Sequence, residues 1–221
     1  MTLDPSLAVA TDNDVLLKAV CYGLTADFWP GAGVLRTVFV LGAARYVVAQ
    51  RVGRATLRKP RAEARAEFLS LLASVTELEP TIEEIGLAAS IEVAAQRAGV
   101  ALDAGESQLT AVVILRAIPV LETGDKRAIR AVDVLLDQAD PLPLVGVRLR
   151  CLEQIVWRLV SEPTIFDRVA NAVCAESAVD RTMSICFGCF SPQRPSAAGV
   201  VAGLESYIDD LRRDAGRVLV P

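Results

Sequence analysis

Short apolar runs alternate along the chain with stretches in which apolar residues recur three and four positions apart. The short runs at 7–12, 76–78 and 119–122 predict buried strands. The longer periodic stretches predict helices at 14–22, 60–75, 82–98, 103–118 and 125–138. Alternation of strands and helices is typical of a parallel sheet that is covered by helices on both faces.

Residues 34–41 fit either a strand or the start of a helix that continues to 52. The segment Asp140-Pro-Leu-Pro143 predicts a boundary between an α/β domain at 1–140 and a mainly helical C-terminal extension at 141–221. In that extension the pattern suggests a strand at 144–149, a loop at 187–198, helices at 152–160 and 199–219, and one or two helices at 164–185.

An apolar stripe marks the last of these helices. Leu204, Tyr207, Ile208 and Leu211 recur at helical spacing. We expect the stripe to pack either on the first domain or on a second copy of the chain.

Composition narrows the class of protein. Apolar residues make up 52% of the 221, mean hydropathy is +0.40 and aromatic residues make up only 5%, which predicts a large aliphatic core. No apolar run approaches the roughly 18 residues of a membrane span. The N-terminus carries Asp4 and no basic segment, so we expect neither a signal peptide nor membrane association. We expect the protein to be cytoplasmic. The chain has no histidine, which excludes Ser-His-Asp triads, Cys-His proteases and histidine-dependent ribonucleases.

Carboxylates follow two of the predicted strands. Asp12 and Asp14 come at the end of the first, and Asp125 follows the run at 119–122. Open α/β sheets place ligands outside the carboxyl ends of their strands. Asp103 and Glu106, three apart on a predicted helix, share a face. Each aspartate alone also fits a helix cap. Their coincidence at strand ends favours a divalent-metal site for the set.

Three segments resemble the metal-binding segments of PIN-domain nucleases: ATDNDVLL (10–17), LDAGESQL (102–109) and ETGDKRAIRA (122–131). They occur in the family's order and at roughly its spacing, and the resemblance covers about residues 5–140. It implies a three-layer αβα fold with a central parallel sheet. Residues 141–221 match no part of that family.

The resemblance also implies an activity, the metal-dependent hydrolysis of phosphodiester bonds, most often in RNA. Asp12, Glu106 and Asp125 would be the catalytic ligands of Mg²⁺ or Mn²⁺. Asp103 would be either a fourth metal ligand or a helix cap. Thr123 would orient a ligand or the attacking water.

One departure from the family pattern weakens this implication. PIN nucleases usually carry an acid on the helix after the second strand, whereas this chain has Leu41-Gly-Ala-Ala-Arg45 there. Either Asp14, Asp103 or Glu63 compensates, with Asp14 as a supporting residue, or the site is weakened. The alternative function is therefore a catalytically weakened PIN-like protein that serves in binding or assembly.

A third interpretation starts from Asp12-Asn-Asp14-Val15, which also resembles the first motif of haloacid-dehalogenase-like phosphatases. Asp125 would be the later metal acid of that family. The further acid expected three or four residues on is replaced by Ala128 and Ile129, and Glu106 is left without a role.

The formal net charge is −4, but residues 45–65 contain seven basic side chains against the single acid Glu63. Local basic patches supply phosphate contacts whatever the total charge. The expected nucleic-acid contacts are Arg51, Arg54, Arg58 and Lys59; the alternative is a solvated helix face. The expected partner is nucleic acid, with single-stranded RNA favoured. An inhibitory or assembly protein and a homodimer are left open.

Four of the five cysteines lie in the C-terminal region. Cys186-Phe-Gly-Cys189 has the spacing of a zinc or iron–sulfur hairpin. With Cys151 and Cys174 it could form an all-cysteine site or a redox pair. Because apolar residues surround these positions, buried free thiols are the expected state. No disulfide is expected in a cytoplasmic chain.

Overall fold

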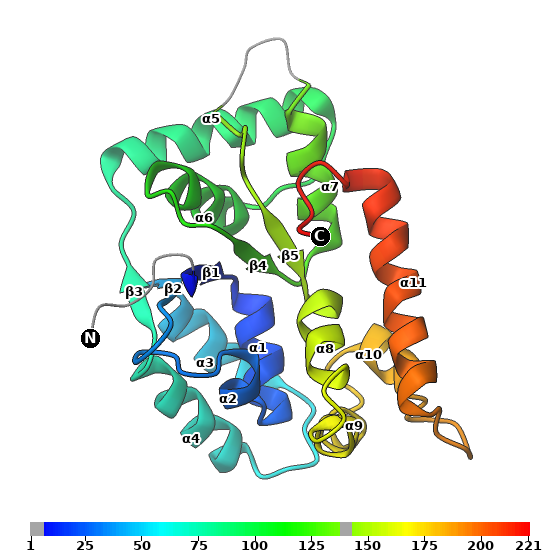
Figure 1. The fold of residues 1–221 in the computed structure, drawn as a ribbon. Coiled ribbons are helices and arrows are strands. Elements are labelled where there is room, and N and C mark those ends of the chain that lie inside the picture. Colours follow the sequence, from blue (N-terminus) through cyan, green and yellow to red (C-terminus); the bar gives the residue numbers. More distant parts are fainter. Residues whose placement is uncertain (1–6, 138–142) are drawn as a thin grey trace.

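The computed structural model describes residues 7–137 and 143–221, which contain a five-stranded parallel sheet between layers of helices (Figure 1). The strand order is β3-β2-β1-β4-β5, so the first strand is central. The predicted α/β class with a central parallel sheet is confirmed. The strands are β1 (Val9–Thr11), β2 (Val38–Leu41), β3 (Thr76–Leu78), β4 (Leu121–Thr123) and β5 (Leu149–Cys151).

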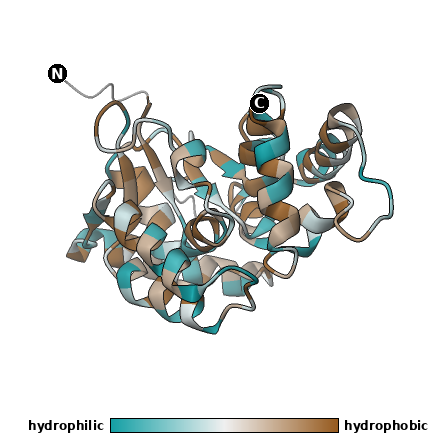
Figure 2. Cartoon of the chain, turned by 90° about the horizontal axis from the view of Figure 1, so that it is seen from below, coloured by the Kyte–Doolittle hydropathy of each residue, from teal (hydrophilic) through white to brown (hydrophobic). Residues whose placement is uncertain are grey.

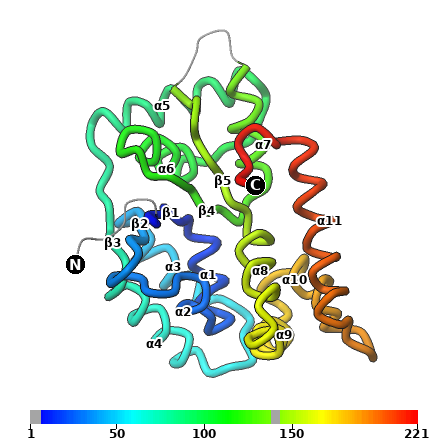
Figure 3. Tube along the Cα trace, viewed as in Figure 1, coloured from blue at the N-terminus to red at the C-terminus, as the bar shows by residue number. Residues whose placement is uncertain are grey.

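The helices follow the strands in the expected alternation, and Figure 3 traces their course. In the first half they are α1 (Asn13–Tyr22), α2 (Thr25–Phe28), α3 (Ala44–Arg54), α4 (Arg61–Leu72), α5 (Ile82–Ala98), α6 (Ala104–Leu115) and α7 (Lys126–Leu135). After β5 they are α8 (Leu152–Val160), α9 (Phe166–Ala175), α10 (Arg181–Cys186) and α11 (Ala197–Ala215).

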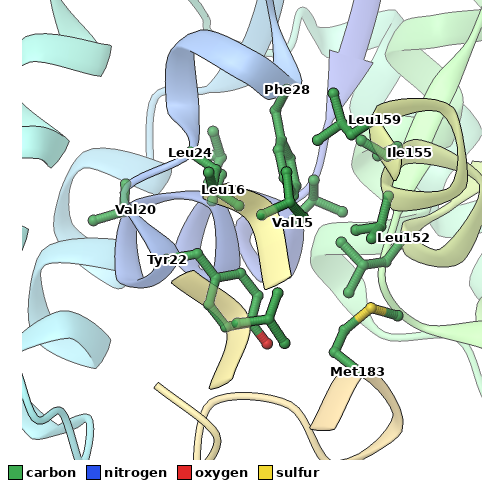
Figure 4. Close-up of a cluster of buried hydrophobic side chains, with 14 of the residues drawn as sticks. Val15, Leu16, Val20, Tyr22, Leu24, Phe28, Leu152, Ile155, Leu159 and Met183 are labelled. Atoms are coloured by element: carbon green, nitrogen blue, oxygen red, sulfur yellow. The ribbon is translucent and has the colours of Figure 1, made fainter. Parts of the chain in front are cut away.

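Each face of the sheet has its own apolar core. Helices α1–α4 and α8–α10 pack on one face, and α5–α7 pack on the other. Figure 4 shows the first core, where α1 and α2 meet α8 and the side chain of Met183. The helices carry both hydrophilic and hydrophobic residues along their length (Figure 2), as expected for elements with one face against a sheet.

Residues 143–221 belong to the same two cores. Strand β5 pairs with β4 and extends the sheet, and α11 contributes side chains to both cores. In the apolar stripe, Leu204, Ile208 and Leu211 are buried within the chain, and Tyr207 lies under the Lys126 ammonium at 4.9 Å. Of the two expected arrangements, the structure shows the stripe packed within the chain, against α8 and α7. The predicted boundary at Asp140 and the predicted helix end at 138 lie outside the described residues, as does Asp4.

Several predicted element bounds are corrected. Residues 38–41 form a strand, and the alternative of one helix from 34 to 52 is wrong. Strand β2 ends before Gly42, whose N–H donates to the Leu78 carbonyl at 2.9 Å. A side chain at position 42 would overlap the Glu79 carboxylate. The stretch 164–185, where one or two helices were expected, forms two. Helix α11 ends at Ala215 because the following residues turn back to hydrogen-bond with Leu149.

The cysteine prediction is wrong for two of the four C-terminal thiols. Cys174 and Cys189 form a disulfide that links α9 to the turn after α10. Packing of α9 against α10 brings these two positions together, with 4.9 Å between their Cα atoms. Cys151 and Cys186 are buried free thiols, as predicted.

Within 7–137 and 143–221, no helix combines the length and the apolar character that crossing a membrane requires.

Candidate functional site

A cavity of about 520 Å³ opens at the carboxyl ends of β1 and β4. From β1 the chain first adds β2 and β3 on one side of this strand, and later adds β4 and β5 on its other side. The strand order therefore reverses between β1 and β4, where the cavity lies. Such points are the usual ligand sites of open α/β sheets. We call the cavity the acidic crevice, because its lining includes all five predicted carboxylates: Asp12, Asp14, Asp103, Glu106 and Asp125.

Asp12 lies at the floor of the acidic crevice and begins α1. One carboxylate oxygen accepts the Val15 N–H at 2.8 Å. The other accepts the Thr123 hydroxyl at 2.5 Å and the Gly124 N–H at 3.1 Å. Burial raises the pKa of Asp12 to about 6 in spite of these bonds, and the neighbouring Asp14 charge adds to the rise. Thr123 therefore orients Asp12, which is one form of its predicted role.

Glu106 and Asp103 form a capping box at the start of α6. The Asp103 carboxylate accepts the Glu106 N–H at 2.8 Å, and the Glu106 carboxylate accepts the Asp103 N–H at 2.9 Å. Burial raises the pKa of Glu106 to about 7, and the charges of Asp103, Asp125 and Asp12 raise it further. Asp103 acts here as a helix cap, the second of its two predicted roles.

Asp125 begins α7 and already has a cationic partner. Its carboxylate accepts the Arg127 backbone N–H at 2.8 Å, and the Arg127 guanidinium forks onto both oxygens, with its shortest distance 2.6 Å. These bonds to Arg127 hold the pKa of Asp125 below its usual range. Asp12 and Glu106 differ, since among the described residues neither forms an ion pair.

Asp14 is neutralised by two cations, Lys18 at 2.6 Å and Arg51 at 3.2 Å. Lys18 also contacts Asp180, at 2.7 Å, so the C-terminal region reaches the edge of the acidic crevice. A Cβ at position 124 would lie against the Asp14 carboxylate, so the glycine there lets the end of β4 approach this side chain closely.

Three of these groups were not predicted from the sequence. Lys18 follows Asp14 by one helical turn, which is a recognisable ion-pair spacing. Arg127 stands two residues after a predicted helix cap. Asp180 gave no signal, because its approach to Lys18 depends on how the distant C-terminal helices pack.

Helix α3 presents Val47 and Arg51 to the acidic crevice, and no acid. This is the helix on which the family pattern expects a carboxylate. Glu63, considered as a substitute, is exposed on α4 and does not line the acidic crevice. Asp14 lies inside it but is already paired.

The four predicted nucleic-acid contacts are placed differently from one another. Arg51 lines the acidic crevice, and Arg54 and Arg58 are exposed beyond it. The Lys59 ammonium instead donates to the Val20 carbonyl at 2.9 Å, near the end of α1. The backbone N–H groups of residues 58 and 59 both donate to the Glu176 carboxylate at 2.7 Å. Lys59 thus holds the loop between α3 and α4 against α1 and the Glu176 carboxylate.

The residues of the acidic crevice fit a hard divalent cation, which prefers oxygen ligands. Asp12 and Glu106 are carboxylates that burial destabilises in their charged form, and a cation would relieve that cost. In the side-chain arrangement of the described residues, however, no three metal-ligating groups lie close enough together to hold an ion. Asp125, which the resemblance makes the third ligand, is held by Arg127 in this arrangement.

No protein-family model, curated protein or solved structure matches the chain.

Proposed function

We propose that this chain is a Mg²⁺- or Mn²⁺-dependent nuclease with a PIN-like fold, which hydrolyses phosphodiester bonds, most readily in single-stranded RNA. One observation carries the proposal. Asp12 and Glu106 share the acidic crevice at the reversal of strand order, both are destabilised as anions, and neither has a cationic partner among the described residues. The three PIN-like segments and the central parallel sheet support the assignment to that fold.

Asp12 and Glu106 would hold the cation, joined by Asp125. A bound divalent cation lowers the pKa of a coordinated water and offsets the charge that develops on the phosphate. The Thr123 hydroxyl and the Gly124 N–H fix the Asp12 carboxylate, so its orientation does not depend on the ligand. Arg51 lines the same acidic crevice and supplies positive charge for the substrate backbone.

The hydrolytic route agrees with the composition. Without histidine the chain lacks the usual acid–base pair for attack by the ribose 2′-hydroxyl. Attack by water needs no 2′-hydroxyl, so the proposed chemistry suits RNA and DNA alike. The preference for RNA rests on the family resemblance alone.

The test is to incubate the full chain with end-labelled single-stranded RNA and DNA in Mn²⁺, Mg²⁺ or EDTA. We expect cleavage of RNA with either metal and none with EDTA. Calorimetric titration with Mn²⁺ in the absence of substrate supplies a second measurement. A chain that neither binds Mn²⁺ nor cuts either polymer would refute the proposal.

A catalytically weakened PIN-like protein for binding or assembly is the second candidate. Two observations favour it. Arg51 lies on the helix where the family pattern expects an acid, and the Arg127 guanidinium occupies the Asp125 carboxylate. Its signature would be RNA that is retained but not cleaved at any metal concentration. The phosphatase interpretation gains no support, because Ala128 and Ile129 are buried on α7 and do not line the acidic crevice.

A further inference from the structure

Arg127 lies at the rim of the acidic crevice, and its side chain is 76% exposed. Its guanidinium contacts the Asp125 carboxylate through Nη2 at 2.6 Å and through Nε at 3.1 and 3.2 Å. Its pKa is raised by Asp125 first, and also by the charges of Glu106 and Asp103. Arg127 is thus the cation that faces the carboxylates of the acidic crevice from α7.

The other two cations of α7, Lys126 and Arg130, are anchored elsewhere. Lys126 pairs with the buried Glu153 at 2.5 Å and lies over the Tyr207 ring. Arg130 pairs with Asp214 at 2.8 Å and with Asp210 at 3.4 Å, both on α11. These contacts hold α7 against the C-terminal region, whereas the contact of Arg127 is with a candidate metal ligand.

The ion pair between Arg127 and Asp125 is easily exchanged. An exposed pair of this kind contributes little, because water screens both charges and ordering the long side chain costs entropy. When the guanidinium leaves, the Asp125 carboxylate keeps its orientation, since one oxygen still accepts the Arg127 backbone N–H at 2.8 Å. The other oxygen is then free to face Asp12 and Glu106.

We propose that Arg127 is a resident counter-ion, which a divalent cation displaces from Asp125, and that the released guanidinium binds a phosphate of the nucleic-acid substrate. This inference rests on the proposed function. A guanidinium matches a phosphate in shape as well as in charge, and two parallel N–H bonds form in either pairing. Metal binding and substrate binding are therefore coupled through one side chain.

The experiment compares Arg127→Ala with Arg130→Ala, a matched control one turn further along α7 that is also paired with carboxylates. Mn²⁺ affinity is measured by calorimetry without nucleic acid. RNA affinity is measured by fluorescence anisotropy in Ca²⁺, with intact RNA verified on a gel. In Arg127→Ala we expect Mn²⁺ to bind about two- to five-fold more tightly, since the competing cation is gone. RNA should bind about ten-fold more weakly.

Arg130→Ala should change neither affinity by more than about two-fold. Arg127→Lys should bind Mn²⁺ like the wild type and RNA with intermediate affinity, because it keeps the charge and loses the fork. Unchanged or weaker Mn²⁺ binding in Arg127→Ala would refute the proposal that Arg127 is a counter-ion displaced by the metal. Unchanged RNA binding in this variant would refute the proposed phosphate contact. Both outcomes leave the proposed function standing if the wild type binds Mn²⁺. A wild type that binds no Mn²⁺ overturns both.

Discussion

Two neighbouring helices begin with the same motif and differ in its electrostatics. Helix α5 begins with a capping box of Thr81 and Glu84, and α6 begins with one of Asp103 and Glu106. In both, the glutamate side chain accepts the N–H of the capping residue, at 2.7 Å in α5 and 2.9 Å in α6. Local sequence therefore explains the start of both helices equally well.

The two glutamates differ in the charged groups around them, and this difference distinguishes a structural residue from a candidate site residue. Arg116 contacts Glu84 at 2.6 and 2.9 Å and lowers the pKa of this carboxyl to about 2. Burial raises the pKa of Glu106 to about 7, and the neighbouring acids add to the rise. A capping box that is completed by an arginine stabilises the fold, whereas one left among carboxylates carries unfavourable charge that a bound cation or a proton would offset.

The most direct test of this difference is to replace each glutamate with glutamine, which removes the charge and keeps the side-chain oxygen that accepts the capping N–H. Glu106→Gln should lower Mn²⁺-dependent cleavage by about 100-fold or more, because a direct ligand is lost. Glu84→Gln should leave the rate within about two-fold when assayed well below its melting temperature. Initial rates on labelled RNA decide between them, and equal losses would end the distinction.

Stability should respond in the opposite order. Glu84→Gln leaves the Arg116 guanidinium without its anion and should lower the free energy of unfolding by about 1–2 kcal/mol. The melting temperature would fall by about 2–4 °C for each kcal/mol. Circular dichroism melts measure this effect. A Glu84→Gln protein as stable as the wild type would show that Arg116 adds nothing to the scaffold.

The dependence of stability on pH should sharpen the contrast further. Folded Asp12 and Glu106 have pKa values of about 6 and 7, above their unfolded values, so the folded state binds protons more tightly. The contribution of these two groups to stability is therefore fully present below about pH 4 and is lost as the pH rises through about 6 and 7. At pH 8, Asp12→Asn or Glu106→Gln should gain about 1 kcal/mol over the wild type, after allowance for solvent screening.

Urea unfolding at pH 4 and pH 8 measures that gain, and saturating Mn²⁺ at pH 8 should cancel it by stabilising the wild type alone. Variants that are less stable than the wild type at pH 8 would mean that capping bonds outweigh the charge repulsion.

The smallest expected effect concerns the basic residues outside the acidic crevice. Each phosphate that is no longer neutralised should reduce the slope of log affinity against log salt by about 0.7 for a single strand. Replacing both Arg54 and Arg58 with alanine should therefore flatten the slope by about 1.4. Arg97→Ala, an exposed position on α5, is the control. Retention of the full slope in the double variant would assign both arginines to a solvated face.

The sequence predicted what depends on local pattern. The apolar run that ends at Asp12 marked β1, and the position of Asp125 after the apolar run at 119–122 placed it at the same edge of the sheet. Parallel pairing of β1 with β4 then brings the acids together. The bounds of β2 and α3 were ambiguous, because Gly42 ends the strand through a contact with β3 that has no local signature.

Features that depend on the long-range path of the chain could not be predicted. Spacing pointed to Cys186 and Cys189 as a pair, but the packing of α9 on α10 joins Cys189 to Cys174. Counting charges suggested that Lys59 is free for phosphate, whereas the fold directs it to the Val20 carbonyl. Charge patterns thus identify candidate residues, and tertiary packing decides which of them remain available.

The central position of β1 has a consequence for the newly made chain. This strand is synthesised before both of its hydrogen-bonding partners, β2 and β4, and Thr123 lies 111 residues beyond Asp12. Both edges of an apolar strand therefore wait unpaired during translation, which is a condition that favours aggregation and the engagement of chaperones. The acidic crevice itself cannot form until β4 has been synthesised.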